Sequence, residues 1–287
     1  MSKVIVLSQI ALPYSKVGSW TTLYHNYLQS NHLIDIIVCP APEQYYSDIK
    51  YGIVKEKMID KFKSKFLQKK KSHFLSASYK CISADGKYVV QLIDNYGMVK
   101  PLHDFLLAKG IRNNFHLQFF YHGFDPYTQN DSPENFYEIL DELVYLTDAS
   151  RSEFTRIIPN LPKHSDVLHN GINTTKFTVA SVDEVAEIKQ QLNIESKNVF
   201  LWCSQDRPKK GLDLILKVWE QVYAGNNNCT LLVVGAHRSE EMPGVRFFGL
   251  IPNAQLPKYY QVADCYLFST LCNEGFGMSL IEALHCG

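Results

Sequence analysis

The chain of 287 residues lacks both an excess of charge of one sign and any pair of closely spaced cysteines. Its formal net charge is zero, which argues against a protein that binds nucleic acid through a basic surface. Its seven cysteines are scattered, odd in number and set among apolar neighbours. This pattern indicates reduced, buried thiols in a cytoplasmic protein.

Long hydrophobic runs are also lacking, since no apolar stretch approaches the ~20 residues that a membrane-spanning helix requires. The N-terminal stretch 4–12 is interrupted by Ser8 and Gln9 and has no small-residue cleavage site, so it predicts a first strand and not a signal peptide. Internal repeats and low-complexity linkers are absent from the sequence as well.

What the chain does contain is an alternation of strand-like and helix-like segments, with a hydrophobic content of 46% that can form a sizeable core. Strands are predicted over 4–10, 34–39, 88–93, 117–121 and 143–146, and helices over 21–29 and 99–108. After Asn170-Gly171 the pattern restarts. Helices are predicted over 182–192, 212–223 and 256–262, and strands over 199–203, 231–234 and 265–268. The alternation predicts an α/β protein of two Rossmann-like domains with parallel sheets.

The last fourteen residues hold the most informative pattern. Glu274 and Glu282 stand eight positions apart around a turn with Gly275 and Gly277, and the apolar residues that follow recur with helical spacing. Glycines let the backbone approach a ligand closely, and the first amides of a helix favour an anion such as a diphosphate. The preceding segment 263–270 predicts a buried strand. Strand, glycine loop and helix in this order form a nucleotide-binding corner of an α/β sheet.

This segment resembles the hallmark of a family of retaining glycosyltransferases, family 4 of the GT-B fold, in which two glutamates enclose seven residues. Segments 169–177, 204–212 and 245–260 resemble the family's domain junction, phosphate-binding loop and the stretch before the final motif. The resemblance implies two Rossmann-like domains facing across a cleft. Residues 1–170 would bind the acceptor and 171–287 the nucleotide-sugar. Family members usually continue with another strand and more helices, so it also predicts an incomplete second domain.

Several residues gain a role through this resemblance. Lys210, after the strand 199–203 and before a helix, is expected to bind phosphate, although a solvated basic loop is the alternative. The family's partner arginine is replaced by Gln205, and Arg207 nearby is expected to substitute for it. Gly18 and Ser19, after the first strand, either bring backbone amides to the donor phosphate or form an ordinary loop.

His122 follows the strand 117–121 and is expected to face the crevice where ligands bind, although a structural role is the alternative. The resemblance implies retention of anomeric configuration by a front-face route, in which the leaving phosphate helps to deprotonate the acceptor. Glu274 would orient the donor sugar and Glu282 would hold the ribose. The predicted catalytic residues are Glu274, His122 and Lys210, and the predicted donor-binding residues are Gly18, Ser19, Arg207, Lys210, Gly275, Phe276, Gly277 and Glu282.

No Asp-x-Asp motif ends a predicted strand, so positive charge is expected from Arg207, Lys210 and helix dipoles. The prediction is a metal-independent enzyme whose only nucleotide is its donor substrate, with no cofactor. Residues 55–71 hold eight lysines against two acidic residues, with apolar residues at helical spacing. This segment predicts either a helix on an anionic membrane surface, at the inner face of the membrane, or a helix packed on its own domain.

The leading hypothesis is a hexosyltransferase that moves a sugar from a nucleotide-sugar to a glycan or lipid-linked acceptor, in polysaccharide or lipopolysaccharide synthesis. A dinucleotide oxidoreductase also suits paired α/β domains, but no Gly-x-Gly-x-x-Gly follows the strands 4–10 or 199–203. A catalytically impaired remnant that binds a nucleotide or a partner stays open, because of Gln205 and the expected incomplete domain.

Overall fold

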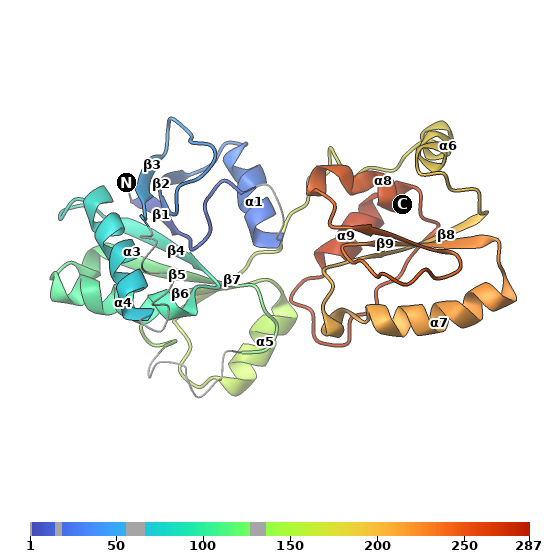
Figure 1. The fold of residues 1–287 in the computed structure, drawn as a ribbon. Helices are drawn as coiled ribbons and strands as arrows, with labels where there is room; N and C mark the ends of the chain where they lie inside the picture. The colour runs from blue at the N-terminus through green and yellow to red at the C-terminus, as the bar shows by residue number, and fades with distance from the viewer. Residues whose placement is uncertain (1, 15–18, 56–66, 127–135) are drawn as a thin grey trace. The chain divides into compact units, whose positions relative to one another are not determined.

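The computed structural model describes residues 2–14, 19–55, 67–126 and 136–287. The chain divides into two compact units, Met1–Asn170 and Gly171–Gly287 (Figure 1). Each unit is built around a parallel β-sheet that carries helices, which confirms the predicted α/β class. The elements keep the labels of Figure 1, and each unit is described by itself.

The first unit holds a seven-stranded parallel sheet with the spatial order β3-β2-β1-β4-β5-β6-β7. Its strands are β1 (Lys3–Leu7), β2 (Ile34–Cys39), β3 (Lys50–Ile53), β4 (Tyr88–Ile93), β5 (Phe115–Tyr121), β6 (Glu142–Tyr145) and β7 (His164–Val167). Its helices are α1 (Ser19–Leu28), α3 (Leu67–Cys81), α4 (Tyr96–Ala108) and α5 (Asp148–Ile157).

Both faces of this sheet are covered, as the side-chain alternation along β1 shows. Ile5 and Leu7 pack into the cluster that contains residues of α3, α4 and α5, whereas Val6 packs into the cluster that contains residues of α1. Burial on both faces explains the near-continuous apolar runs of the central strands. The carboxyl ends of β1, β4 and β5 therefore meet at one edge of a rigid sheet.

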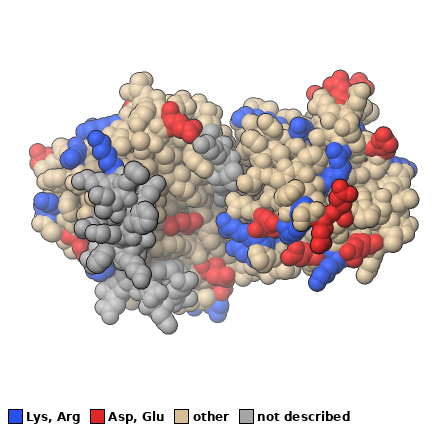
Figure 2. Space-filling view, in the orientation of Figure 1, with Lys and Arg blue, Asp and Glu red and all other residues tan. Residues whose placement is uncertain are grey.

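The second unit holds a four-stranded parallel sheet with the order β10-β9-β8-β11. Its strands are β8 (Asn198–Cys203), β9 (Cys229–Val234), β10 (Val245–Gly249) and β11 (Cys265–Tyr266), and its helices are α6 (Val182–Gln191), α7 (Leu212–Gly225), α8 (Pro257–Gln261) and α9 (Met278–His285). Trp202 of β8 packs with α7 on one face, and Leu201 packs with α8 on the other. Figure 2 shows acidic and basic side chains intermixed over the described part of this view of the second unit.

Several bounds differ from those that the sequence predicts. The first strand ends at Leu7 instead of residue 10, because the backbone turns there: Ile10 N donates to Ser8 Oγ at 3.0 Å and Ser8 Oγ donates to Ile10 O at 2.6 Å. The strand predicted over 265–268 is formed only by Cys265–Tyr266. The elements β3, β7, β10 and α5 were not predicted, and the predicted basic segment 55–71 overlaps α3 only at 67–71.

Most of the basic segment 55–71 lies outside the described residues, which resume at Leu67 with α3. The predicted membrane-surface helix therefore stays a prediction. Within the described ranges, no helix is long and apolar enough to cross a membrane.

Candidate functional site

The loop between β8 and α7 carries the predicted phosphate-binding lysine. A single 3-10 turn over Pro208–Lys210 follows the strand, and Gly211 then caps α7 with a φ of +71°. A Cβ atom at Gly211 would lie 2.1 Å from the carbonyl oxygen of Ser269, so only glycine fits this close approach of two loops. The hydroxyl of Ser269 donates to the carbonyl of Lys210 at 2.9 Å and fixes the same contact from the other side.

The loop between β11 and α9 carries the first predicted glutamate. Glu274 forms an ion pair with Lys210 Nζ, and the hydroxyl of Thr270 donates to Glu274 Oε1 at 2.9 Å. The two side chains come from loops 64 positions apart, and each is about one-fifth exposed. Lys210, Gly211, Ser269, Thr270 and Glu274 are called the loop cluster below. It brings together two residues that the sequence assigned to the same reaction.

The predicted glycine turn leads into α9 as expected. Gly277 is the N-cap of this helix with a φ of +76°, a conformation that L-residues rarely adopt. Gly275 and Phe276 lie in the half-buried loop before it. The first amides of α9 lack intrahelical partners, so this end of the helix favours an anion.

The second predicted glutamate is almost fully buried. Glu282 lies on the second turn of α9, is only 7% exposed, and accepts a hydrogen bond of 2.9 Å from the hydroxyl of Tyr260 on α8. Burial raises the pKa of Glu282 to about 7, and hydrogen bonds from Tyr260 and Asn253 oppose this shift. The carboxyl group is thus held where its charge changes near neutral pH.

The predicted substitute arginine does not join the loop cluster. Arg207 is exposed and, among the described residues, its side chain has no hydrogen-bonding or ionic partner. The arginine that contacts this loop is Arg238, which follows β9 and pairs with Asp206, the neighbour of Arg207. Arg238 also donates to Asp213 Oδ1 of α7 at 3.0 Å. The hydrogen bond to Asp206 is the largest cause of a raised pKa of Arg238. Sequence analysis missed Arg238, because no motif surrounds it.

In the first unit, polar groups gather where β1, β4 and β5 end. Gln9 donates from Nε2 to Asn95 Oδ1 at 2.6 Å, and Asp94 Oδ1 accepts from the backbone amide of His122 at 2.9 Å. Asp94 has a φ of +46°, which is unusual for a residue other than glycine and often marks a functional site. Gln9, Asp94, Asn95 and His122 are called the strand-end cluster below.

Two buried atoms of this cluster have no partner among the described residues: Asn95 Nδ2 and His122 Nδ1. Burial lowers the pKa of His122 to about 4, so its imidazole is neutral at pH 7, and burial raises the pKa of Asp94 to about 6. A neutral imidazole with a free ring nitrogen and an unpaired amide can hydrogen-bond a hydroxylated ligand. Of these residues, sequence analysis identified only His122, although Asp94 and Asn95 also follow a buried strand directly.

The predicted donor-binding residues Gly18 and Ser19 cannot be placed in the site. Gly18 lies outside the described residues, and Ser19 begins α1 with a side chain that is not described. Within the described ranges, no three His, Cys, Asp or Glu side chains converge as a ligand set for a metal ion.

Comparison with known families agrees with the geometry of the second unit. Residues 184–287 match the family model described as glycosyl transferases group 1. The chain is similar to a GDP-mannose-dependent monoacylated alpha-(1-6)-phosphatidylinositol monomannoside mannosyltransferase of Corynebacterium glutamicum, with 24% identity over 164 residues. The aligned residues are 52% of this chain and 43% of that protein. The chain is 22% identical over 170 residues to the O-antigen chain mannosyltransferase B of Escherichia coli, covering 54% and 44%. The chain thus spans less than half the length of these relatives.

Solved structures match the whole chain. A sucrose-phosphate synthase from Thermosynechococcus elongatus superposes with a TM-score of 0.72 at 16% identity, over 100% of this chain and 80% of that one. Anabaena HepE in complex with UDP and glucose also gives a TM-score of 0.72, at 14% identity, over 100% and 79%. The chain has the GT-B fold of these structures, and most of its second unit, residues 184–287, matches the glycosyl transferases group 1 family model.

Proposed function

We propose that the chain is a retaining glycosyltransferase of family 4 that transfers a hexose from a nucleotide-sugar to a glycan or lipid-linked acceptor. The observation that carries this proposal is the loop cluster. It places a cation, Lys210, beside a carboxylate, Glu274, which lies on the loop that leads into α9. Lys210 Nζ has three donors, so it can hold Glu274 and a phosphate oxygen together.

In this proposal the cluster binds the diphosphate and orients the sugar. Lys210 and the first amides of α9 stabilise the charge that develops on the leaving diphosphate, without a metal ion. Glu274 accepts hydrogen bonds from the sugar hydroxyls, and Glu282 accepts from the ribose. The bond from the anomeric carbon to the diphosphate breaks while the bond to the acceptor oxygen forms on the same face. The acceptor proton passes to the leaving phosphate, which yields a nucleoside diphosphate.

The acceptor is assigned to the strand-end cluster of the first unit. Asn95 Nδ2 and His122 Nδ1, which have no partner in the described part of the chain, suit the hydroxyl groups of a glycan. We further propose mannose as the sugar and GDP as the nucleotide, because both curated relatives named above are mannosyltransferases and one is GDP-mannose-dependent. Their names also favour a lipid-linked or O-antigen acceptor in cell-envelope synthesis.

Calorimetric titration of GDP, UDP and ADP tests the donor site. Lys210→Gln should weaken binding of the preferred nucleotide about tenfold or more, because it removes a charge-assisted hydrogen bond. Lys209→Gln is the matched control, since the neighbouring lysine is exposed and should change affinity by less than about twofold. Absence of binding by all three nucleotides, or equal effects of the two variants, would contradict the proposal.

Turnover separates an enzyme from an impaired remnant. With GDP-mannose and a mannosylated lipid acceptor, we expect release of GDP, an unchanged rate in excess chelator, and a product whose proton NMR spectrum shows the donor's anomeric configuration. An inverted product would overturn retention, a chelator-sensitive rate would overturn metal independence, and nucleotide binding without turnover would favour the remnant.

Peripheral membrane association through 55–71 is part of the proposal, because eight lysines there can add ~1 kcal/mol each on an anionic surface. Co-sedimentation with phosphatidylglycerol vesicles at low salt, compared with phosphatidylcholine vesicles, tests it. Absence of co-sedimentation with either kind of vesicle would contradict this association.

A further inference from the structure

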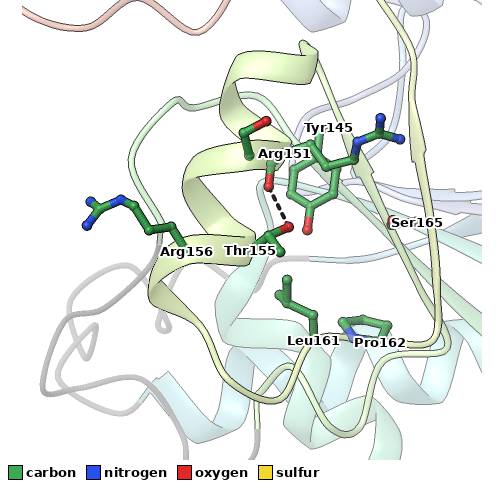
Figure 3. Close-up of a pocket in the computed structure, with 8 residues that line it drawn as sticks. Tyr145, Arg151, Thr155, Arg156, Leu161, Pro162 and Ser165 are labelled. Carbon is green, nitrogen blue, oxygen red and sulfur yellow. Dashed lines mark hydrogen bonds between the residues drawn. The ribbon is translucent and has the colours of Figure 1, made fainter.

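A pocket lies in the first unit at β6, the strand that pairs with β5. It has a volume of about 660 Å³ and is formed by β6, α5, the loop after α5 and β7. Figure 3 shows α5 along one side and β7 with its preceding loop along the other. The lining residues are Tyr145, Arg151, Ser152, Thr155, Arg156, Leu161, Pro162 and Ser165. A space of this size accommodates a ligand larger than a single ion.

Tyr145, the last residue of β6, directs an unsatisfied polar group into this pocket. The side chain is only 1% exposed, and its hydroxyl has no hydrogen-bond partner among the described residues. In Figure 3 the hydroxyl points between Thr155, Leu161 and Pro162. Burial raises the pKa of Tyr145 to about 12, and the positive charge of Arg151 opposes the shift. The group is therefore a neutral donor that lacks an acceptor, and buried polar groups of this kind are rare in folded proteins.

The other polar groups of the lining divide into donors and acceptors. Ser152 donates to Asp148 O at 2.8 Å and Thr155 donates to Arg151 O at 2.9 Å, so their oxygens are left as acceptors. Ser165 has no side-chain partner among the described residues, which leaves its hydroxyl free to donate. A lining with free donors and free acceptors suits a ligand with several hydroxyl groups.

The charge of the lining is positive, and none of the described lining residues is acidic. Arg151 and Tyr145 overlap in the view of Figure 3, and among the described residues the ionic contact of Arg151 is with the exposed Asp148, at 2.8 Å. Exposed pairs of this kind are weak and easily exchanged for a stronger anion. Arg156 differs: its guanidinium points away from the pocket and forms two hydrogen bonds with Glu153.

We propose that this pocket binds a phosphorylated polyol. Its phosphate pairs with Arg151 at the rim, and its hydroxyls take up the Tyr145 and Ser165 donors and the Ser152 and Thr155 oxygens, while Leu161 and Pro162 contact its carbon skeleton. The ester can be the headgroup of a phospholipid or a free sugar or glycerol phosphate. No residue of the loop cluster takes part, so this site can exist whether or not the chain transfers a sugar.

Calorimetric titration of glycerol 3-phosphate and glucose 6-phosphate, with GDP in excess to occupy any nucleotide site, tests the proposal. Saturable binding to the wild-type chain is expected, about tenfold or more weaker after Arg151→Gln or Tyr145→Phe. Arg156→Gln, the matched control, should bind like the wild type. Tyr145→Phe removes an unpaired hydroxyl without changing the ring, so its thermal unfolding temperature should not fall, which separates lost binding from misfolding.

Vesicles distinguish the two sources of the ester. Stronger co-sedimentation of the wild-type chain than of Arg151→Gln with phosphatidylglycerol vesicles, but not with phosphatidylcholine vesicles, would identify a lipid headgroup. Binding of the free esters alone would identify a soluble phosphate. Equal affinities of the wild type and both pocket variants, equally tight binding of glycerol or of inorganic phosphate, or no binding of either esters or vesicles would overturn the proposal.

Discussion

Glu282 offers the sharpest quantitative test of the structure, because one buried carboxyl group should make the stability of the chain depend on pH. The side chain is 7% exposed, and its pKa is raised from 4.5 to about 7, chiefly by burial. Glutamine has the same shape and resembles the protonated acid. Glu282→Gln should therefore preserve the packing on Tyr260 while removing the titration.

The sign follows from which state holds the proton. Between pH 4.5 and about 7 the folded chain keeps the proton on Glu282 and the unfolded chain releases it, so the free energy of unfolding falls as pH rises. The interval of about 2.5 pH units corresponds to roughly 3 kcal/mol, at about 1.4 kcal/mol per unit. Between pH 4.5 and about 7 the free energy of unfolding of the wild type should fall by this amount relative to that of Glu282→Gln. At pH 4.5 the two free energies should be nearly equal.

Urea unfolding from pH 4.5 to 8 measures this difference, with the fluorescence of Trp202 and Trp219, both buried in the second unit, as the probe. Other titrating groups, such as His122, affect both proteins alike and cancel. A difference that stays constant with pH, or a wild type that gains stability relative to the variant above pH 5, would refute the assignment of a buried, proton-retaining carboxyl group. A companion titration of GDP should show loss of affinity in Glu282→Gln if the ionised carboxylate holds the ribose.

Two further substitutions test the packing. Gly211→Ala should destabilise the chain by about 2 kcal/mol or more, because the residue has positive φ and its Cβ would meet Ser269 O. Thermal unfolding measures this loss, and Gly225→Ala is the control because nothing lies within 4 Å of a Cβ there. Equal effects of the two substitutions would contradict the close approach of the loops. Arg112→Met should cost about 3 kcal/mol by urea unfolding, because Arg112 pairs with a carboxylate at 2.8 Å and donates to two backbone carbonyls. Arg156→Met removes only an exposed ion pair and should hardly change the free energy of unfolding, so a similar loss in both variants would refute that ranking.

Much of the fold is predictable because the central strands are apolar and buried on both faces. The segments 34–39 and 88–93 were predicted with the bounds that β2 and β4 have. The missed elements β3, β7, β10 and α5 lack this signal, and no residue of β10 is fully buried. β7 exposes three of its four residues, β3 contains a glycine against which Cys81 packs, and α5 is mostly polar with only two buried residues. Their structure depends on neighbouring strands and on the Thr147 N-cap rather than on hydrophobic periodicity.

The residues of the candidate site also fall into those that a sequence pattern predicts and those that none predicts. Lys210 and Glu274 could be predicted because motifs surround both, and the structure joins them, although their roles stay predictions. Asp94 and Asn95 follow β4 as His122 follows β5, so the strand-end argument applied to His122 could have found them. Arg238 could not be found, since its contacts with Asp206 and Asp213 join segments that are neighbours only in the folded sheet.

The geometry also explains why the arginine expected beside Lys210 can be absent without loss of the loop. In this chain Arg238 holds Asp206 and Asp213, which flank the 3-10 turn over Pro208–Lys210, so the turn is anchored from β9. Gly211 and Ser269 anchor it from the other side. The lysine is thus positioned by Arg238 and by the loop of Ser269, without an arginine at position 205. In the proposed function the positive charge for a diphosphate comes from Lys210 and the amides of α9, so replacing this lysine is expected to weaken nucleotide binding strongly.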